Sequence, residues 1–352
     1  MDCACLPPPP LNEKAADSEP RDGDGISVVV TVRDEADQLA DLLDALKGQT
    51  RAPDEVVIVE GGTSSVTAEL VSDWRDRGLP VRLIEAPGVN ISRGRNVGIE
   101  SAANEWIACT DAGCRPLADW LAQIDRARAE SEFIGGIWIA RGETPFEQAV
   151  AVALHPDPSE IDTTQGWVKL WHVLFGRRYA LARSTGRSMA FTKRAWRAAG
   201  GFPERLYAGE DVSFSRAMGR EGIEGRLVPE AAVLWRPHPT LRGTARAYVR
   251  YARGDVRGGL LARHVIRALA LVVAPWLLLR GGRLTRLLVL LAAAAYFALP
   301  LRRARAAGMA AHEYLWLIPG VVLVRDVATT VGAAQGIADE MAGRSQPSPP
   351  IR

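Results

Sequence analysis

The sequence predicts an α/β domain with a mostly parallel sheet and helices on both of its faces, followed by apolar helices. Three observations support this prediction. Between residues 26 and 199, short runs of β-branched residues alternate with amphipathic segments, and several of these runs end on acidic residues. After about Leu260 the composition shifts to uncharged runs with arginines at their ends. Strands and helices that alternate in this way are typical of a parallel sheet covered on both faces.

The individual elements follow from residue spacing. Residues 26–32 are rich in valine and carry no charge, as expected of a strand buried on both faces. Leucines at 39, 42, 43 and 46 then lie on one face of a helix that should close near Gly48. The same criteria give strands at 56–59, 81–84, 106–110, 133–140 and 188–192, and helices at 65–77, 92–103, 118–129 and 193–199. No element is assigned to residues 141–186, a candidate region for acceptor binding.

Composition excludes some classes of protein. The chain has 352 residues, 47% of them hydrophobic, and a formal net charge of +2, whereas a dedicated nucleic-acid binder usually has a clear basic excess. We therefore expect no nucleic-acid partner. Four cysteines do not make a disulfide scaffold, and Cys109 and Cys114 lack a CxxC spacing, which favours a reduced, cytoplasmic setting. Residues 1–25 lack the regions of a secretory signal, and we expect disordered tails at 1–25 and 342–352.

Three apolar runs follow the α/β region, at 268–279, 287–301 and 315–324. Each is shorter than the ~20 residues of a spanning helix, but arginines at their ends could snorkel and extend them. Membrane association through spanning or in-plane helices is the favoured interpretation, and a soluble helical subdomain is the alternative. One full crossing would place Arg280, Arg283 and Arg286 outside, against the positive-inside tendency. We therefore expect the first two runs to form a shallow or re-entrant pair, with the third run undecided.

Carboxylates in two segments suggest a site. Asp111 ends the strand at 106–110, and Glu210 and Asp211 begin a helix after the glycine-rich segment GGFPERLYAG. An α/β fold brings the carboxyl ends of its strands to one crevice, and carboxylates gathered there suit a hard divalent cation and a general base. The structural alternatives are a turn or cap role for Asp111, and compensation of the helix dipole by Glu210 and Asp211.

At these residues the chain resembles the family 2 glycosyltransferases, enzymes of GT-A fold that move a sugar from a nucleotide diphosphate. The resemblance covers about residues 26–240 and consists of five blocks in the family's order: ISVVVTVRDEADQLADLLDALKGQT, VVIVEGGTSS, RGRNVGI, TDAGC and GGFPERLYAGEDVSF. It implies an α/β GT-A domain, a nucleotide diphosphate sugar as donor, and inversion at the anomeric carbon of the sugar.

The resemblance also implies roles for the acidic residues. Asp211 would deprotonate the acceptor hydroxyl, with Glu210 orienting acceptor or base. Asp111 matches the first acid of an Asp-X-Asp triplet that holds a divalent metal, Mn or Mg, against the diphosphate. Gly113 stands at the triplet's third position, so the second carboxylate is missing. His238, in WRPHPT, matches a histidine that completes the metal shell or contacts the diphosphate, although a lone histidine is more often structural.

Donor-binding roles are implied in the same way. Thr31 and Arg33 end the first strand, where the family places the nucleoside. Glu60 could accept a hydrogen bond from the base, although Gly61 replaces a second acid there and a strand-ending acid can simply precede a turn. Arg95 and Asn96 match the Arg-Asn pair before the metal acid; Arg95 would pair with phosphate, or lie on a solvated helix face.

A basic helix is expected after the catalytic region. Arg246, Arg250, Arg253 and Arg257 recur at helical spacing and could meet anionic lipid headgroups or a pyrophosphate-linked lipid acceptor, or form a solvated face. The predicted organisation is therefore a disordered tail at 1–25, a catalytic domain at 26–240, an amphipathic basic linker helix at 241–262, membrane-associated helices at 263–341 and a tail at 342–352.

The sequence thus predicts a glycosyltransferase at the cell membrane, with its catalytic domain cytoplasmic. Its expected partners are a nucleotide diphosphate sugar, a glycan or lipid-linked acceptor of the cell envelope, and membrane lipids. The alternative is a membrane-attached protein that binds nucleotide sugars with weak or no catalysis, because glycine replaces a family acid at 61 and at 113. A nucleotidyltransferase is disfavoured, because RDEADQ after the first strand is not a phosphate loop.

Overall fold

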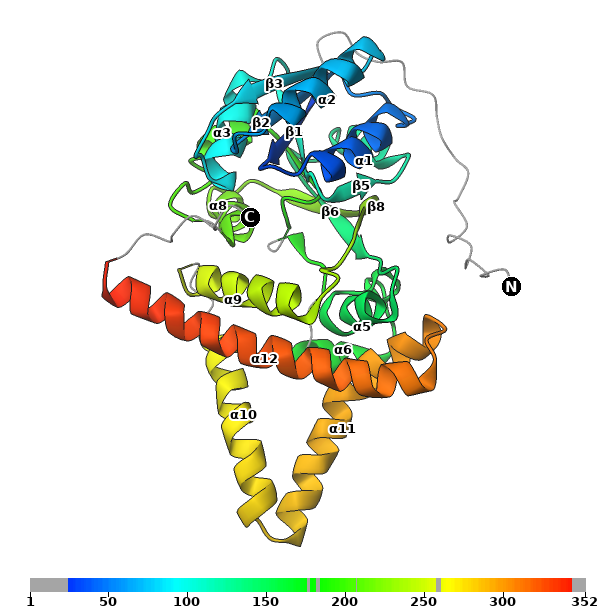
Figure 1. The fold of residues 1–352 in the computed structure, drawn as a ribbon, viewed down its shortest axis with the longest axis vertical. Coiled ribbons are helices and arrows are strands. Elements are labelled where there is room, and N and C mark those ends of the chain that lie inside the picture. Colours follow the sequence, from blue (N-terminus) through cyan, green and yellow to red (C-terminus); the bar gives the residue numbers. More distant parts are fainter. Residues whose placement is uncertain (1–24, 176–177, 182–183, 207, 258–260, 344–352) are drawn as a thin grey trace.

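The computed structural model describes residues 25–343 except 176–177, 182–183, 207 and 258–260. The expected tails lie outside the described residues apart from Gly25, Ala342 and Gly343. The described chain forms an α/β domain, a layer of helices beneath it, and a helical hairpin that projects from that layer (Figure 1).

Half of the eight-stranded sheet is parallel, as the sequence predicts. Its strand order is β3-β2-β1-β4, with β1 at Ile26–Val32, β2 at Glu55–Glu60, β3 at Val81–Glu85 and β4 at Trp106–Asp111. Thr31 lies opposite Asp111 in the register of β1 and β4. The carboxyl ends of these strands therefore meet at one edge, which is where an α/β sheet places its ligand crevice.

The other half is mixed in direction. It continues as β7-β6-β8-β5, with β5 at Cys114–Pro116, β6 at Phe133–Ala140, β7 at Met189–Thr192 and β8 at Gly225–Trp235. β7 runs antiparallel to both β4 and β6, whereas β6 and β8 are parallel to each other. The residues just before β7 therefore lie beside the carboxyl end of β4, together with the carboxyl ends of β6 and β8.

Helices cover both faces of the sheet because alternate residues of its strands point to opposite sides. Val28, Val30 and Ile58 pack with α1 (Ala36–Lys47), α2 (Ser65–Asp76) and α4 (Trp120–Ala127). Val29 and Val57 pack on the other side, with α3 (Ile91–Ser101), α7 (Lys193–Ala198) and α8 (Glu210–Arg220). This arrangement confirms the predicted fold class.

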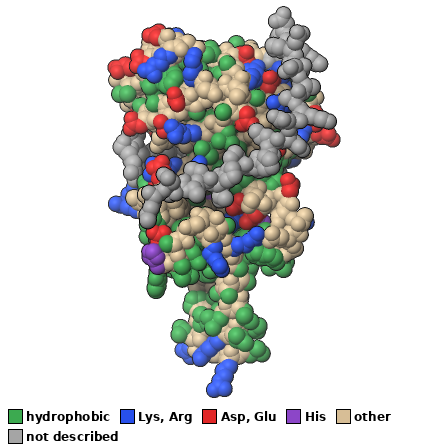
Figure 2. All heavy atoms as spheres, turned by 90° about the vertical axis from the view of Figure 1, so that its right-hand side faces the viewer, with side chains coloured by type: hydrophobic (Ala, Val, Ile, Leu, Met, Phe, Trp, Pro, Cys, Tyr) green, Lys and Arg blue, Asp and Glu red, His purple; other side chains and the backbone are tan. Residues whose placement is uncertain are grey.

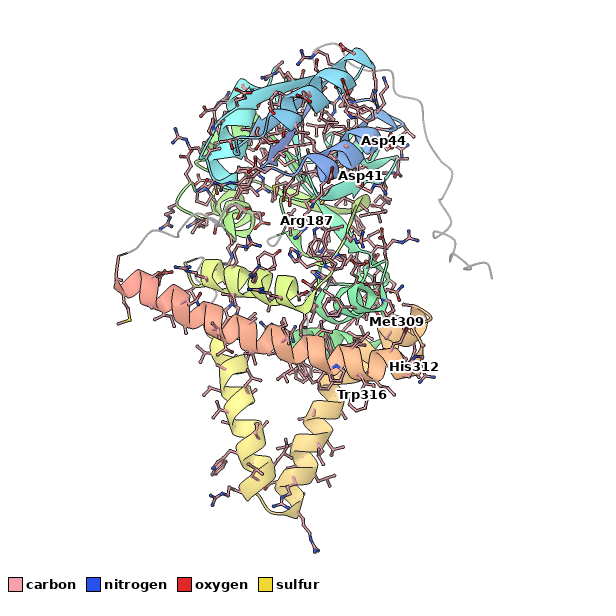
Figure 3. The ribbon with its side chains drawn as sticks, viewed as in Figure 1. Asp41, Asp44, Arg187, Met309, His312 and Trp316 are labelled. Carbon is pink, nitrogen blue, oxygen red and sulfur yellow. The ribbon has the colours of Figure 1, made fainter. Side chains whose placement is uncertain are left out.

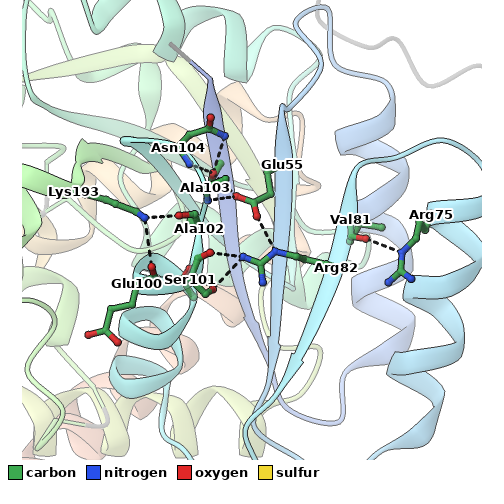
Figure 4. Close-up of polar contacts among 12 residues, drawn as sticks. Glu55, Arg75, Val81, Arg82, Glu100, Ser101, Ala102, Ala103, Asn104 and Lys193 are labelled. Atoms are coloured by element: carbon green, nitrogen blue, oxygen red, sulfur yellow. Dashed lines mark hydrogen bonds and ion pairs between the residues drawn. The ribbon is translucent and has the colours of Figure 1, made fainter. Parts of the chain in front are cut away.

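Glu55, at the start of β2, joins several segments at the amino ends of the parallel strands, opposite the crevice (Figure 4). Its carboxylate accepts hydrogen bonds from Ser27 Oγ at 2.6 Å, the Ala103 backbone N–H at 2.7 Å and Arg82 Nε at 2.7 Å. These bonds connect the turn between α3 and β4 to the neighbouring strands β1 and β3.

A layer of helices lies beneath the sheet domain. It contains α5 (Pro145–Leu154), a 3-10 turn at Pro158–Glu160, α6 (Gly166–Leu174), α9 (Leu241–Arg257) and α12 (Ala311–Met341). α5 and α6 fall within residues 141–186, for which the sequence predicts no element. The start of α5 carries a capping box, in which Thr144 and Glu147 satisfy each other's backbone N–H groups, with Pro145 in the first turn.

α9 and α12 pack closely through glycines. A Cβ added at Gly332 would lie 2.2 Å from the backbone oxygen of Val249, and one at Gly336 would lie 3.0 Å from that of Arg253. A buried cluster joins residues of α5, α9, α11 and α12, including Leu154, Tyr248, Ala304 and Val322. The C-terminal helices therefore share a core with the segment that follows β6.

α10 (Leu261–Arg280) and α11 (Arg283–Ala306) form a hairpin whose open end meets α12 (Figure 1). Its surface is largely apolar, with Val272, Trp276 and Leu288 71%, 60% and 57% exposed, and basic side chains lie at its tip (Figure 2). By length and composition two helices in the described residues could cross a membrane, α11 and α12, although α12 is half buried against the protein. The hairpin shape agrees with the pairing expected of the first two apolar runs; its depth in a membrane stays a prediction.

Candidate active site

A pocket of about 1110 Å³ opens at the carboxyl edge of the sheet, between the strands and α9. The parallel ends of β1 and β4, the start of α8 and the ends of β6 and β8 all contribute to its wall. The predicted site residues among its lining residues are Thr31, Arg33, Arg95, Asp111, Glu210, Asp211 and His238.

Arg95 joins two of the predicted acids. Its Nη2 donates to Asp111 Oδ1 and its Nη1 to Glu210 Oε1, both at 2.7 Å. The Arg95 side chain is only 2% exposed. Burial alone would lower the pKa of Arg95, but the two carboxylates outweigh it and raise that pKa above its ordinary value. This buried triad fixes the end of β4 against the start of α8.

Asp211 is the second acid at the start of α8, after Gly209 with its left-handed φ of 77°. Its Oδ1 accepts from the Val212 N–H at 2.7 Å and its Oδ2 from the Gly186 N–H at 3.2 Å. Burial, and then the neighbouring charge of Glu210, raise the pKa of Asp211 to about 7, against the opposing effect of Arg95. A carboxylate with a pKa near neutrality is suited to act as a general base.

Asn96 holds the glycine-rich loop that precedes α8. Its side-chain nitrogen donates to the Phe202 carbonyl at 2.9 Å, and its oxygen accepts from the Phe202 N–H at 2.9 Å. The loop bends through Gly200 and Gly201, with φ of 78° and 73°, a conformation that favours glycine. Asn96 is thus placed behind the pocket, where it positions the loop, rather than among the residues that line the pocket.

Glu60 also lies outside the lining. It is 3% exposed, and its two oxygens accept from the Gly62 N–H and the Thr67 hydroxyl, both at 2.6 Å. Glu60 therefore closes the turn after β2. Thr31 and Arg33 do face the pocket, and the buried Nε of Arg33 has no hydrogen-bond partner among the described residues.

The sequence alone does not predict several of the lining residues. Arg187, two residues before β7, packs against two tryptophans at the ends of β6 and β8: its guanidinium carbon lies 4.6 Å from the Trp235 ring centroid and 5.7 Å from that of Trp138. Glu35, beside the pocket, has a raised pKa because of burial and the charge of Asp111. No local sequence pattern marks Arg187 or Glu35 as a site residue, because tertiary packing rather than residue spacing brings them to the pocket.

The donors present do not fit a metal ion held by the protein alone. The described residues contain no group of three or more His, Cys, Asp or Glu side chains able to hold a metal. Asp111 Oδ1 is already paired with Arg95, and Gly113 supplies no oxygen ligand from a side chain. His238 lines the same pocket with its ring 6.3 Å from that of Trp235.

The predicted basic face of α9 does not form one surface toward lipid. Arg250 lines the pocket, and Arg253 forms an ion pair with Asp339 of α12. The side chain of Arg257 lies outside the described residues. Two of the four arginines thus face protein, because α9 is enclosed between the sheet domain and α12.

Comparisons with known proteins agree with this geometry. Residues 27–182 match the family described as "Glycosyl transferase family 2". "Uncharacterized glycosyltransferase EpsJ" of Bacillus subtilis (strain 168) is 27% identical over 86 residues, which are 24% of this chain and only 25% of that relative.

Among solved structures, a Pyrobaculum calidifontis mannosyltransferase in complex with GDP-Man and Mn2+ superposes with a TM-score of 0.55 at 20% identity, covering 90% of this chain and 87% of the other. The structure of S. aureus TarS 1-349 in complex with UDP superposes with a TM-score of 0.46 at 16% identity. The match covers 91% of this chain and 92% of the other. Residues 27–182 therefore resemble a glycosyl transferase family 2 domain, and the described chain has the GT-A fold.

Proposed function

We propose that the protein transfers a sugar from a nucleotide diphosphate sugar to a glycan or lipid-linked acceptor, with inversion at the anomeric carbon. The observation that carries this proposal is Asp211: a carboxylate with a pKa near 7, held by two backbone N–H groups in a pocket large enough for a sugar and a diphosphate. The mannosyltransferase structure contains GDP-Man, which supports the donor class.

In the proposed reaction the acceptor hydroxyl gives its proton to Asp211. The acceptor oxygen attacks the anomeric carbon, and the bond from that carbon to the diphosphate oxygen breaks. Asp211 can serve as the base because Arg95 already pairs with Glu210 and Asp111 but leaves Asp211 without an ion pair in the described residues. Glu210, locked by Arg95, positions the base, and Thr31 and Arg33 lie where a nucleoside would bind.

A divalent cation, Mn²⁺ or Mg²⁺, would have Asp111 as a protein ligand and would take most of its other ligands from the diphosphate and water, with His238 as a further candidate. Bound there, it would offset charge on the diphosphate. We expect Asp111→Asn to abolish any Mn²⁺-dependent gain in nucleoside diphosphate affinity while the protein stays folded, because the change removes one charge at constant shape. Titration of UDP and GDP with and without Mn²⁺ measures this, and an unchanged gain would remove Asp111 from the site.

The transfer itself is tested with the full-length protein in detergent. A panel of nucleotide diphosphate sugars is screened for release of nucleoside diphosphate, and the anomeric configuration of the product is read by NMR. Retention of configuration would refute the proposed inversion. Binding of a donor without any turnover would favour the second candidate, a nucleotide-sugar-binding protein, which the glycines at 61 and 113 support.

Membrane attachment is part of the same proposal. The exposed apolar hairpin of α10 and α11 supports it, as does Trp316, which is 82% exposed and lies on the hairpin side of α12 (Figure 3). Tryptophan is enriched at membrane interfaces. We propose that α12 lies along the membrane surface, that the hairpin enters the bilayer, and that the sheet domain faces the cytoplasm at the cell membrane.

A further inference from the structure

Arg187 is one of the residues that line the pocket. Because β7 runs antiparallel to β4, with Met189 opposite Cys109, the residues before β7 lie beside Asp111 at the end of β4. The guanidinium of Arg187 packs against the indoles of Trp138 and Trp235 and projects into the space between the sheet and α9 (Figure 3). The two aromatic rings restrict its orientation, so its donors face a defined part of the pocket.

Among the described residues Arg187 forms no ion pair with a carboxylate, and its buried Nε has no hydrogen-bond partner there. The contrast with Arg95 is direct, because Arg95 binds both Asp111 and Glu210 at 2.7 Å. A buried charged donor left unpaired costs free energy, so the site is prepared for an anion.

The chemistry of that anion follows from the shape of the group. A planar guanidinium presents paired donors that match two phosphate oxygens, and stacking on aromatic rings keeps its plane fixed. The donor of the proposed reaction carries two phosphates, and Asp111, near which they would lie, already has one oxygen paired with Arg95. Gly113 removes the second acid through which a cation would be held.

We propose, resting on the proposed function, that Arg187 binds the diphosphate of the donor, and that nucleoside diphosphate binding therefore does not require a divalent cation. The arginine offsets the negative charge that develops on the leaving diphosphate as the bond to the sugar breaks. It is a catalytic residue in this assignment because it touches the substrate.

The test compares Arg187→Met, Arg187→Lys and the control Arg141→Met in the full-length protein in detergent. Arg141 is an exposed lining residue of the same pocket, and its bond to Trp235 is made by its backbone N–H. Its substitution therefore removes one positive charge but leaves the guanidinium that packs on the two tryptophans in place. Calorimetric titrations with UDP and GDP are run in EDTA and again with Mn²⁺.

We expect wild-type binding to persist in EDTA, and Arg187→Met to weaken it about ten- to hundredfold, the usual scale for a charged hydrogen bond. Arg187→Lys should recover part of the loss, and Arg141→Met should change little.

Two outcomes would overturn the role of Arg187 but not the proposed function. One is nucleotide binding by the wild type that depends wholly on Mn²⁺, and the other is normal nucleotide affinity in Arg187→Met. If that variant instead raised only the KM for a phosphate-bearing acceptor, the anion would be the acceptor's and the donor assignment would be wrong. Failure of both nucleotides to bind the wild type under any condition would overturn the proposed function as well. If thermal unfolding shows that Arg187→Met is not folded, the nucleotide affinity of Arg187→Lys tests the proposal instead, because this variant keeps the charge and loses the planar fork.

Discussion

Arg95 is buried between two carboxylates, and one small residue keeps it there. A Cβ added at Gly186 would lie 2.0 Å from Arg95 Nη2, closer than real Cβ atoms come to any neighbour. The same residue donates its backbone N–H to Asp211. Gly186 therefore controls both the triad and the proposed base.

We expect Gly186→Ala to lower turnover at least tenfold, on the order of a misplaced catalytic group, and to lower the melting temperature, because the new methyl group must displace Arg95 from Asp111 or Glu210. The control is Gly219→Ala in α8, where an added Cβ meets nothing within 4 Å and alanine should stabilise the helix by up to about 1 kcal/mol. Steady-state rates and thermal unfolding compare the two. Equal behaviour of both variants would show that the triad tolerates movement of Arg95.

The raised pKa of Asp211 makes activity depend on pH. Only the ionised carboxylate can accept a proton, so kcat/KM should fall about tenfold per pH unit below about 7 and level off above it. Asp211→Asn should lower turnover by a factor of ~10² or more with donor affinity nearly unchanged, and should remove this pH dependence. A variant with near-wild-type turnover would make Glu210 the next candidate for the base.

The effect of the same group on stability has the opposite sign. Because folding raises the pKa of Asp211, the protonated form favours the folded state. That contribution is fully present below the ordinary aspartate pKa and is lost as pH rises through about 7. Thermal unfolding of wild type and Asp211→Asn at pH 5 and pH 8 should show the asparagine variant gaining relative stability at the higher pH. The same difference between the two proteins at both pH values would mean that the carboxyl does not titrate in this range.

At the scale of elements, local patterns predicted the parallel half of the sheet well and the other half poorly. Strands such as β1 and β2 are apolar runs between amphipathic helices, so short-range sequence determines them. The direction of β7 depends on its pairing with β4 and β6, which no local pattern shows, and Arg187 escaped notice for that reason. α5 was missed although Thr144 and Glu147 carry a capping signature in the sequence.

The arginines on α9 were predicted to share one exposed face, and this prediction also depended on tertiary packing that local sequence does not show. Their spacing showed that they share a helix, but not that the helix would be covered on both sides. α12, which covers one side, begins 54 residues after the end of α9 when counted from Arg257 to Ala311. Contacts over such separations depend on tertiary packing rather than on periodicity.

The exposed apolar surface of α10 and α11 leads to a prediction about membrane binding. Val272→Asp together with Leu288→Asp should release the protein from vesicles in a flotation assay, because an aspartate within the bilayer costs about 2.5–3.5 kcal/mol. Val66→Asp in α2 is the matched control, since Val66 is 53% exposed but lies on the sheet domain. If the double variant floats as the wild type does, the hairpin is not the attachment.

At the scale of the whole molecule, α9 joins the pocket to the C-terminal layer. Tyr251 and Asp255 line the pocket, while the backbone at Val249 packs on Gly332 of α12. The buried cluster shared with α5 extends this connection to the segment after β6. The catalytic region and the apolar helices are therefore parts of one packed structure.

Gly332→Leu tests the connection. The leucine must push α12 away from the Val249 carbonyl, so we expect lower turnover, together with a lower melting temperature. Gly320→Leu in the same helix, where nothing lies within 4 Å, should leave turnover nearly unchanged. Equal turnover in the two variants would show that the pocket is insensitive to the position of α12.

The close packing of α9 on α12 has a further consequence. If α12 lies at the bilayer surface as proposed, the pocket wall that rests on it would be exposed to the lateral pressure and thickness of that bilayer. Detergent micelles and lipid bilayers would then act differently on α12, so the width of the pocket beside α9 should differ between them. On this proposal the lipid environment would act as an allosteric effector of sugar transfer, without binding in the pocket.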